Sequence, residues 1–523
     1  MEKVRSILED NPILRDKLFC RGFYFTNAEI VTGEYPFYDN WDLIHTDGFS
    51  LAVHKKQHFY ISKEQDTTLL LIGHAYDPID RMPDEQDILS CLNRLLGKDK
   101  EQFWDKFNNL TGIFTLIAIR GHRVYLVGDP TGMQTTFYSK RGDKIYISSH
   151  TNLLGDLLGC RWDPYVKELV SYRFFSLLGN SLPGDITQFR SVRRLVPNHY
   201  ICFEPMGKIR IRRFFTPYEM EGTLEELAGR AADILHANME LIAKKWRRPA
   251  ISLTGGCDSK TTLACTNGLY DRFSYFSYVS SEPERVDAEA ARDICDTLGI
   301  DHTTYMIPDD NEGYSNLSEI DEILFWNSGG IKRSHANDVR KRAFFADTKD
   351  FDVEVKSWAS EIGRAYYSKR FHGRTNFGDR PTPRRCTTLY KFFLHNRKLV
   401  RQTDAVFAGY LKRFFRQDRK HPIPWQEQFF WEFRVPSWNG LVITGEHRYS
   451  YDITIPYNNR KLLTILLGAS IEERIEDVLY KKIRDDRNPE IDATGVSVTN
   501  FLHTEKREMM ENLYYTLLSE IPF

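Results

Sequence analysis

Several features that the sequence lacks limit what this chain can be. None of its apolar runs approaches the ~20 residues that a membrane-spanning helix needs. Residues 1–18 mix charged and apolar side chains and lack the continuous apolar core of a signal peptide. The eight cysteines include no CxxC pair and the fifteen histidines no HExxH motif. A disulfide framework and a zinc site are therefore not expected.

An excess of charge of either sign is missing as well. Lys and Arg total 71 against 72 Asp and Glu, which gives a formal net charge of −1. A nucleic-acid-binding or polybasic membrane-binding protein needs an excess of basic residues, so neither a nucleic acid nor a membrane is expected as a partner. With 523 residues, the chain is long enough to bury several substantial cores. We expect a soluble, cytoplasmic, globular protein.

The pattern of the sequence changes near residue 215. Before this point, short β-type runs such as 112–119 alternate with turns, and helical spacing occurs at 86–96 and 104–110, which predicts an α+β domain. After it, a long helical pattern covers 224–245. Alternating strands and helices then predict a parallel, doubly wound sheet with ranges 250–253, 260–267, 273–279 and 287–298. Residues from 325 onward are expected to be mostly helical.

The strongest local signal is the turn that follows the strand at 250–253. It reads Leu253-Thr254-Gly255-Gly256-Cys257-Asp258-Ser259-Lys260. Two adjacent glycines let backbone N–H groups approach an anion, and the start of a helix adds partial positive charge. Asp258 would repel phosphate by itself, but it fits such a site if it holds Mg²⁺ that bridges phosphate oxygens. The Walker A and GxGxxG spacings are absent. The simpler alternative is an ordinary turn with an Asp N-cap.

The sequence TGGCDS at 254–259 resembles the SGGxDS pyrophosphate loop of the PP-loop ATP pyrophosphatases. Further segments extend the resemblance to the asparagine synthetase and β-lactam synthetase family. In the order that the family has them, these segments are 128–138, 147–150, 194–200, 287–302 and 456–460.

The resemblance implies two domains. Residues 1–215 would form an α+β sandwich similar to the Ntn amidohydrolase fold of class II amidotransferases. Residues 216–523 would form an α/β PP-loop domain, similar to the adenine nucleotide α-hydrolases, in which helical additions surround a parallel sheet. The implied activity is that of an AMP-forming amide ligase that uses ATP and Mg²⁺. A small-molecule carboxylate would be activated as an acyl-adenylate, and ammonia or a substrate amine would then displace AMP.

The resemblance also implies roles for individual residues. ATP and pyrophosphate would be bound by Leu253, Thr254, Gly255, Gly256, Asp258, Ser259 and Ser357, with Tyr278 and Val279 beside the adenine. Asp258 and Glu361 would hold Mg²⁺. Glu361 stands where the family has its SGEGxDE motif, but the glycines of that motif are missing, and a solvated glutamate is the alternative interpretation.

The N-terminus departs from the glutamine-hydrolysing members of the family. Those members expose a cysteine directly after the initiator methionine, whereas this chain begins Met1-Glu2 and its nearest cysteine is the internal Cys20. We therefore expect no glutaminase activity, unless a removable segment ends just before Cys20. Nitrogen would come from free ammonia, from a separate glutaminase or from a substrate amine.

The family's catalytic lysine is missing too, because Glu476 stands at its position. Lys481 and Lys482 are the nearest cations in the sequence and Lys260 lies in the loop, so these three are candidate catalytic residues together with Asp258. Other candidates are Lys332, Lys356 and Arg448, and a non-catalytic homologue that binds a nucleotide or a partner is a further alternative. A basic stretch at 369–385 is either a solvated loop or a lid for an anionic substrate. A different PP-loop chemistry, such as tRNA modification, is less consistent with the composition.

Overall fold

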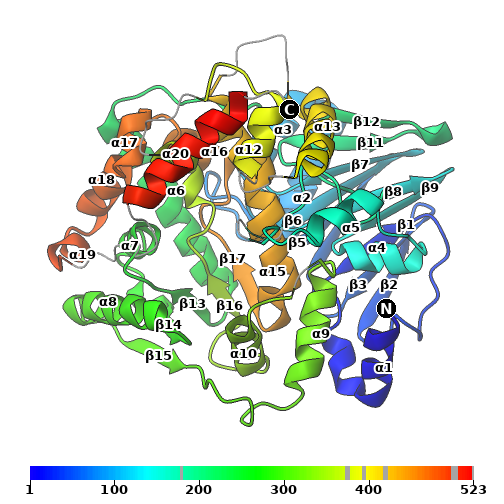
Figure 1. Cartoon of the computed structure of the whole chain (residues 1–523), viewed down its shortest axis with the longest axis horizontal. Helices are drawn as coiled ribbons and strands as arrows, with labels where there is room; N and C mark the ends of the chain where they lie inside the picture. The colour runs from blue at the N-terminus through cyan, green and yellow to red at the C-terminus, as the bar shows by residue number, and fades with distance from the viewer. Residues whose placement is uncertain are drawn as a thin grey trace.

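The computed structural model describes residues 1–176, 179, 181–331, 333–371, 377–390, 396–415, 422–495 and 505–520. Over these residues the N-terminal half contains two six-stranded antiparallel sheets, and the C-terminal half contains a five-stranded parallel sheet. In Figure 1 the antiparallel strands lie on the right and the parallel sheet on the left. The change from one architecture to the other falls between β12 (Ile209–Arg213) and α6 (Leu224–Lys245).

The two antiparallel sheets pack face to face. The first has the order β10-β8-β9-β1-β3-β2, with β1 (Phe23–Thr26), β2 (Trp41–Thr46), β3 (Phe49–His54), β8 (Phe137–Arg141), β9 (Lys144–Ser148) and β10 (Arg193–Arg194). The second has the order β12-β11-β7-β6-β5-β4, with β4 (Phe59–Glu64), β5 (Thr67–Tyr76), β6 (Thr111–Arg120), β7 (Arg123–Gly128) and β11 (His199–Phe203). Alternate side chains such as Phe25, Ile72 and Leu126 fill the space between them.

Helices cover the outer faces of this sandwich. Side chains of α2 (Glu85–Lys98) and α3 (Lys100–Asn108) pack on the second sheet, which explains why all ten residues of β5 are buried. On the first sheet, α1 (Glu2–Asp10) and α4 (Thr151–Leu157) share a core with α9 (Leu317–Asn327) of the C-terminal half. The N-terminal half is thus an α+β sandwich, as predicted.

The parallel sheet has the order β15-β14-β13-β16-β17. Its strands are β13 (Pro249–Ser252), β14 (Ser274–Val279), β15 (His302–Met306), β16 (Val353–Val355) and β17 (Asp452–Thr454). Since β14 and β16 lie on opposite sides of β13, the carboxyl end of β13 is the switch point of the sheet, where ligands of α/β proteins bind. The predicted parallel sheet is confirmed.

Helix boundaries follow the caps that the sequence provides. The long helix α6 has its predicted bounds because Thr223 and Glu226 form a capping box. The next helix, α7 (Cys257–Ala264), begins three residues before the predicted start because Gly256 is its N-cap. It is followed by α8 (Glu282–Leu298).

The remaining described elements are mostly helical, as expected for the C-terminal region. They are η1 (Pro12–Lys17), α5 (Pro164–Val170), η2 (Pro205–Gly207), η3 (Tyr270–Arg272), α10 (Ala336–Phe344), η4 (Ser360–Arg364), α11 (Tyr366–Arg370), α12 (Pro383–Tyr390), α13 (Arg397–Phe414), α14 (Trp425–Phe429), η5 (Phe430–Arg434), η6 (Pro436–Gly440), α15 (Leu441–Gly445), η7 (His447–Tyr449), α16 (Arg460–Leu466), α17 (Ile471–Ile475), α18 (Val478–Arg487), α19 (Glu490–Ala493) and α20 (Glu505–Glu520). Of these, η5 and η6 are π-helical turns. No described helix has both the length and the apolar character needed to cross a membrane.

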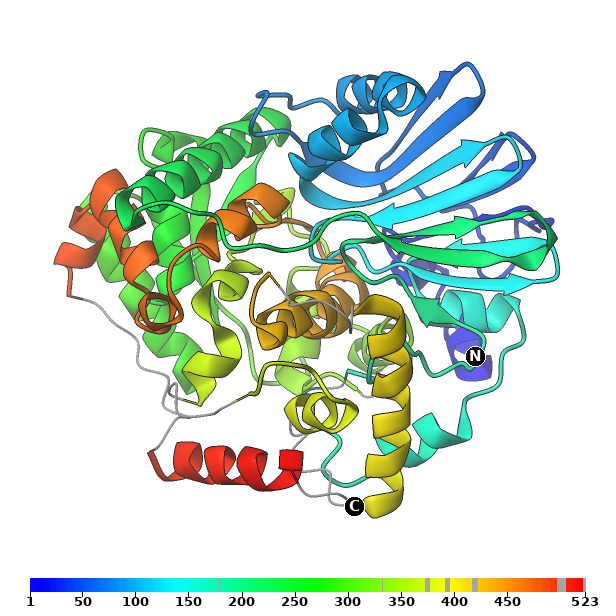
Figure 2. The same ribbon diagram turned by 90° about the horizontal axis from the view of Figure 1, so that it is seen from above.

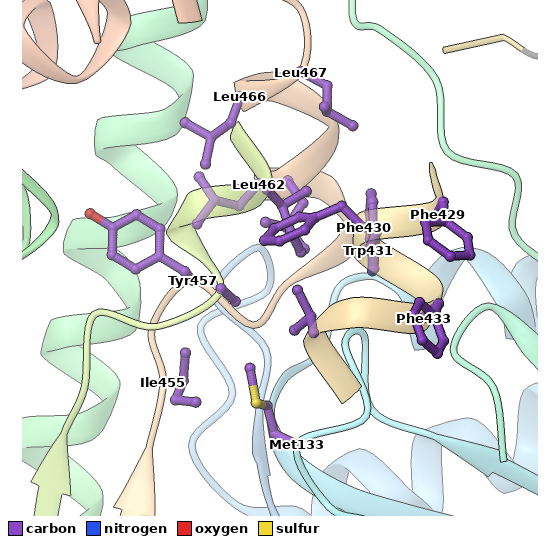
Figure 3. Packing of buried hydrophobic residues seen from close by; sticks show 14 of the residues in the cluster. Met133, Phe429, Phe430, Trp431, Phe433, Ile455, Tyr457, Leu462, Leu466 and Leu467 are labelled. Atoms are coloured by element: carbon purple, nitrogen blue, oxygen red, sulfur yellow. The ribbon is translucent and has the colours of Figure 1, made fainter. Parts of the chain in front are cut away.

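One apolar core joins the two halves. Residues 425–440 lie between the sandwich and the parallel sheet (Figure 2), and their aromatic side chains other than Trp438 are buried, as the sequence predicted for 429–433. Figure 3 shows Met133 of the sandwich beside Ile455 of the C-terminal half, in the same cluster as Trp431. The Trp431 indole N–H also donates to the Pro130 carbonyl oxygen at 2.8 Å.

Three of the segments that resemble the synthetase family meet at this junction. The buried Asp129 carboxylate accepts backbone N–H bonds from residues 131 to 134 and a side-chain bond from Asn458 at 3.0 Å. Arg460 donates to the Asn198 side chain at 3.0 Å. These motifs therefore hold the two halves together.

A buried ion pair lies at the same junction. Arg448 donates to Asp452 at 3.1 Å and also to Gln134 and Gln57 of the sandwich. Arg21 donates to the Arg448 carbonyl oxygen at 2.7 Å. The Arg448 guanidinium is therefore occupied by contacts at the junction of the two halves.

Gly440 allows a close backbone approach of the two halves. A Cβ atom at this position would lie 2.4 Å from the Gly132 carbonyl oxygen, a backbone atom that cannot move aside cheaply. We expect Gly440→Ala to lower the free energy of unfolding by about 1–3 kcal/mol, as overpacking does elsewhere. Denaturant unfolding, followed by tryptophan fluorescence, measures this loss.

Gly229→Ala is the matched control, because Gly229 lies within α6 and a Cβ there would meet nothing within 4 Å. Alanine should be neutral there or stabilise the helix by up to ~1 kcal/mol. If the two variants were equally stable, the close contact at Gly440 would have no energetic weight.

Candidate functional site

The loop after β13 lies at the switch point of the parallel sheet and is fixed there by hydrogen bonds. Leu253 is buried and donates its N–H to the Phe276 carbonyl oxygen of β14 at 2.8 Å. The Thr254 and Ser259 hydroxyls lie 2.9 Å apart, and the Gly256 N–H donates to Thr254 Oγ1 at 3.2 Å. The loop and the first turn of α7 together present backbone N–H groups and hydroxyls, which suit an anionic ligand.

Asp258 lies in the first turn of α7 with its two carboxylate oxygens in different situations. Oδ2 accepts a hydrogen bond from Arg364 Nη1 at 2.6 Å. Oδ1 is buried and has no hydrogen-bond partner among the described residues. A buried carboxylate oxygen without a donor is costly, so this atom is suited to a ligand that the chain itself does not supply.

Arg364 is a site residue that sequence reasoning missed. Besides Asp258, it contacts both carboxylate oxygens of Asp477 at 2.8 Å, and Lys369 joins Asp477 at 2.6 Å. Two cations and two carboxylates thus meet beside the loop. Arg364 lies three residues after Glu361, the predicted metal ligand.

Strained backbone surrounds this cluster. Ala359 and Ala365 flank η4 with φ angles of 69° and 47°, and Asp477 has φ 55°. Non-glycine residues in the left-handed region cost about 1–3 kcal/mol each when they are bulky or poorly supported, and they concentrate at functional sites. The strain therefore supports a functional role for the turn that carries Glu361 and Arg364.

Glu361 lies in η4. Burial and then the Asp258 charge raise the pKa of this carboxyl to about 7, against the opposing charge of Arg364. Magnesium is bound by one or two carboxylates together with phosphate oxygens and water, so Asp258 and Glu361 fit the ion chemically. Among the described residues, no cluster of three or more His, Cys, Asp or Glu side chains could hold a metal. The chain alone thus offers an incomplete site.

A carboxylate from α8 already contacts the loop. Burial raises the pKa of Asp287 above its ordinary value. The Gly255 N–H donates a hydrogen bond to this carboxylate, which lowers the pKa in part. Asp287 belongs to a segment that resembles the family, but it had no predicted role in the site. In this contact a backbone N–H group of the loop donates to an anionic oxygen.

The other predicted nucleotide contacts lie in different surroundings. Ser357 lies 2.7 Å from Thr262 of α7, hydroxyl to hydroxyl, which places the end of β16 beside the loop. Tyr278 and Glu361 line a cavity of about 630 Å³. Val279 is buried, and its carbonyl oxygen accepts a hydrogen bond from the Ile307 N–H at 2.9 Å.

The described lysines among the predicted catalytic residues form ion pairs with other carboxylates or are exposed. Lys260 pairs with Asp492 of α19 at 3.0 Å, and Lys356 pairs with Glu354 at 2.6 Å. Lys482 pairs with Asp486 on α18 at 3.3 Å, and Lys481 is exposed on the same helix. Lys332 is outside the described residues. The cation that the structure brings to Asp258 is Arg364.

The basic residues at 369–385 contact two different parts of the chain. Lys369 belongs to the Asp477 cluster, whereas Arg384 pairs with Asp404 of α13 at 2.5 Å. Residues 372–376, including Arg374, are not among those described. Arg384 is therefore paired with a helix of its own chain, whereas Lys369 belongs to the cluster of charged side chains beside the loop.

The comparisons with known proteins assign no family. Neither a protein-family model nor a curated protein matches the chain. Among solved structures, glutamine phosphoribosylpyrophosphate amidotransferase from B. subtilis, complexed with ADP and GMP, is similar over 70% of this chain and 74% of that one, with 12% identity and a TM-score of 0.23. A structure titled as the allosteric regulatory enzyme of purine biosynthesis covers 71% of this chain and 74% of its own, with 11% identity and a TM-score of 0.25. Similarity at this level supports no inference about this chain.

Proposed function

We propose that the chain is an AMP-forming amide ligase of the PP-loop type, similar to asparagine synthetase, which uses ATP and Mg²⁺. The observation that carries the proposal is the buried, unpartnered Oδ1 of Asp258 at the switch point of the parallel sheet. This atom lies in a loop of backbone donors, beside a second carboxylate, Glu361. Such a set is suited to magnesium-bound phosphate.

Each part of the loop would have a distinct task in this proposal. Backbone N–H groups at 255–257 and the Ser259 hydroxyl would hold the pyrophosphate portion of ATP. Asp258 and Glu361 would hold Mg²⁺, which neutralises phosphate charge when bound. Arg364 would supply positive charge in place of the family's missing lysine, since its guanidinium already contacts Asp258. The carboxylate to be activated would enter from the cavity that Glu361 lines.

The N-terminal half would serve as a scaffold in this proposal. Cys20 is 2% exposed, and the residues around it are tied to the C-terminal half by Phe19 N–H to Asn327 and Lys17 to the Ala346 carbonyl oxygen. A buried thiol in such a segment is poorly placed to become an N-terminal nucleophile. Ammonia, a separate glutaminase or a substrate amine would then supply the nitrogen.

One observation favours a second candidate, a nucleotide-binding homologue without catalysis. Asp258 Oδ2 is already neutralised by Arg364, so a metal would have to share this carboxylate with a guanidinium. In that case ATP would bind, but no acyl-adenylate would form.

ATP–pyrophosphate exchange tests the proposal. We expect the purified chain to bind Mg·ATP by calorimetry and to exchange labelled pyrophosphate into ATP when a pool of small carboxylic acids is present. Binding without exchange would support the non-catalytic homologue. A chain that shows no nucleotide binding and no exchange at millimolar nucleotide would refute both the ligase and the non-catalytic homologue.

A further inference from the structure

A second cavity lies on the outer face of the sandwich, where α2 and α3 meet the second antiparallel sheet. Its lining residues belong to α2, α3, β6, β7 and β11, and its volume is about 240 Å³. An apolar cavity of roughly 150 Å³ holds benzene, so this cavity has room for a ring with a short carbon chain. No residue of the loop at 254–259 belongs to its lining.

Apolar and aromatic side chains form most of the wall of this cavity. Phe103 and Leu116 are buried members of the core between the helices and the sheet, and they line the cavity. Trp104 stacks on Phe214 with the ring centroids 4.2 Å apart and on Tyr200 with the centroids 5.5 Å apart. These stacked rings hold one wall in place, so the cavity is a built feature of the fold. Its surface suits the apolar part of a ligand.

The charged residues that line the cavity are both cations, Lys100 and Arg120. The Lys100 ammonium lies 5.8 Å from the centre of the Tyr200 ring and forms no ion pair with a described residue. Arg120 pairs with Asp66 at 3.2 Å, but the two side chains are 50% and 64% exposed, and such a pair is weak in water. Glu101, which follows Lys100 in the sequence, is exposed and lies outside the lining. The lining therefore carries positive charge and no carboxylate.

Neighbouring positions on the same face of the sheet add further positive charge. Arg123 and Arg212 are the cross-strand partners of two lining residues, and cross-strand partners share a face. Two carboxylates near this face are already engaged, because Glu204 pairs with Arg210 at 3.0 Å and Asp99 accepts N–H bonds from the first turn of α3. An anionic group at the mouth of the cavity thus meets a surface of opposite charge.

We propose that this cavity binds an amphipathic monocarboxylate, whose apolar body lies among the aromatic and aliphatic walls and whose carboxylate lies at Lys100 and Arg120. The inference goes beyond the proposed function and does not depend on it, because the cavity shares no lining residue with the loop at 254–259 or with the cavity that Glu361 lines. It assigns a ligand to the N-terminal half, which the proposed ligase uses only as a scaffold.

Three probes test the charge preference without nucleotide. 4-Phenylbutanoate, 4-phenylbutylamine and 4-phenyl-1-butanol share an aromatic body and differ in charge, and calorimetry with tryptophan fluorescence measures the binding of each to the full chain. We expect the carboxylate to bind at least ~5-fold more tightly than the alcohol, and the amine to bind most weakly. One exposed ion pair is worth up to about this factor, and two cations are available. Added salt should reduce the preference, because it screens exposed charges.

Variants assign the preference to this cavity. Lys100→Gln should weaken the carboxylate by roughly 3- to 5-fold and leave the alcohol unchanged, whereas Lys167→Gln, at an exposed position of α5, should change neither. Ala118→Leu should weaken the carboxylate and the alcohol alike, because Ala118 lines the cavity and a larger side chain fills the space for the apolar body. Tighter binding of the amine, absence of carboxylate binding, or a carboxylate affinity that either folded variant leaves unchanged would overturn the inference.

Two further measurements on the same preparations separate the alternatives. A dimer in analytical ultracentrifugation that Ala118→Leu weakens would assign the cavity to a second copy of the chain and would also overturn the inference. Carboxylate binding at this cavity without Mg·ATP binding would refute the ligase while the carboxylate site stands. Nucleotide exchange without 4-phenylbutanoate binding would refute the carboxylate site alone.

Discussion

Asp258→Asn should abolish ATP–pyrophosphate exchange while the protein remains folded. The substitution keeps the shape of the side chain but removes the negative charge at the unpartnered Oδ1 atom. If this oxygen holds the metal on the pyrophosphate, exchange should fall by at least ~100-fold, or about 2.7 kcal/mol, which is typical for the loss of one electrostatic contact in a transition state. Initial rates at saturating Mg·ATP measure the effect.

Asp486→Asn is the matched control for this experiment. Asp486 makes its ion pair with Lys482 on the outer part of α18, away from the loop. The same chemical change there should leave exchange near the wild-type rate. Wild-type exchange by a folded Asp258→Asn protein would remove this loop from the mechanism.

Asp452→Asn should lower the free energy of unfolding more than Gly440→Ala does. Asp452 is 3% exposed and lies against Arg448 at 3.1 Å and Arg21 at 3.9 Å. Removing its charge leaves two guanidinium groups near the junction without their carboxylate. Loss of one partner of a buried ion pair typically costs about 3–5 kcal/mol. Denaturant unfolding at pH 7 measures the loss, and Asp486→Asn again serves as the control.

The pH dependence of this effect has a definite sign. Burial would raise the pKa of Asp452, but the Arg448 and Arg21 charges outweigh burial and hold that pKa below its ordinary value. A carboxylate with a depressed pKa adds stability above the unfolded-state pKa of ~4, and this stability is lost as the pH falls below it. The difference between wild type and Asp452→Asn should therefore shrink between pH 5 and pH 2. A constant difference across this range would show that the charge itself does not stabilise the junction.

Local signals predicted much of the fold. The start of α6 is fixed by a capping box, and the parallel strands appear as short β-type runs between helical patterns, so nearby residues suffice to locate them. The same holds for the loop at 254–259, whose two glycines and hydroxyls are consecutive.

The site beyond this loop depends on contacts that no local pattern contains. Arg364 and Asp477 are 113 residues apart in the sequence, and Arg364 and Asp258 are 106 apart. A charge run indicates an exposed surface, so Lys369 could not be separated from its neighbours in the basic stretch. The structure assigns it to Asp477 because α11 lies against α17, next to the turn that carries Asp477.

The polar and apolar contacts at the junction have a practical consequence for expression. A cut near residue 215 would leave Met133 and the Asp129 carboxylate on one fragment, and Trp431 and Asn458 on the other. Each fragment would expose to water a surface that is buried in the intact chain. Neither fragment is therefore suited to crystallisation or assay on its own. The whole polypeptide is the smallest unit worth purifying.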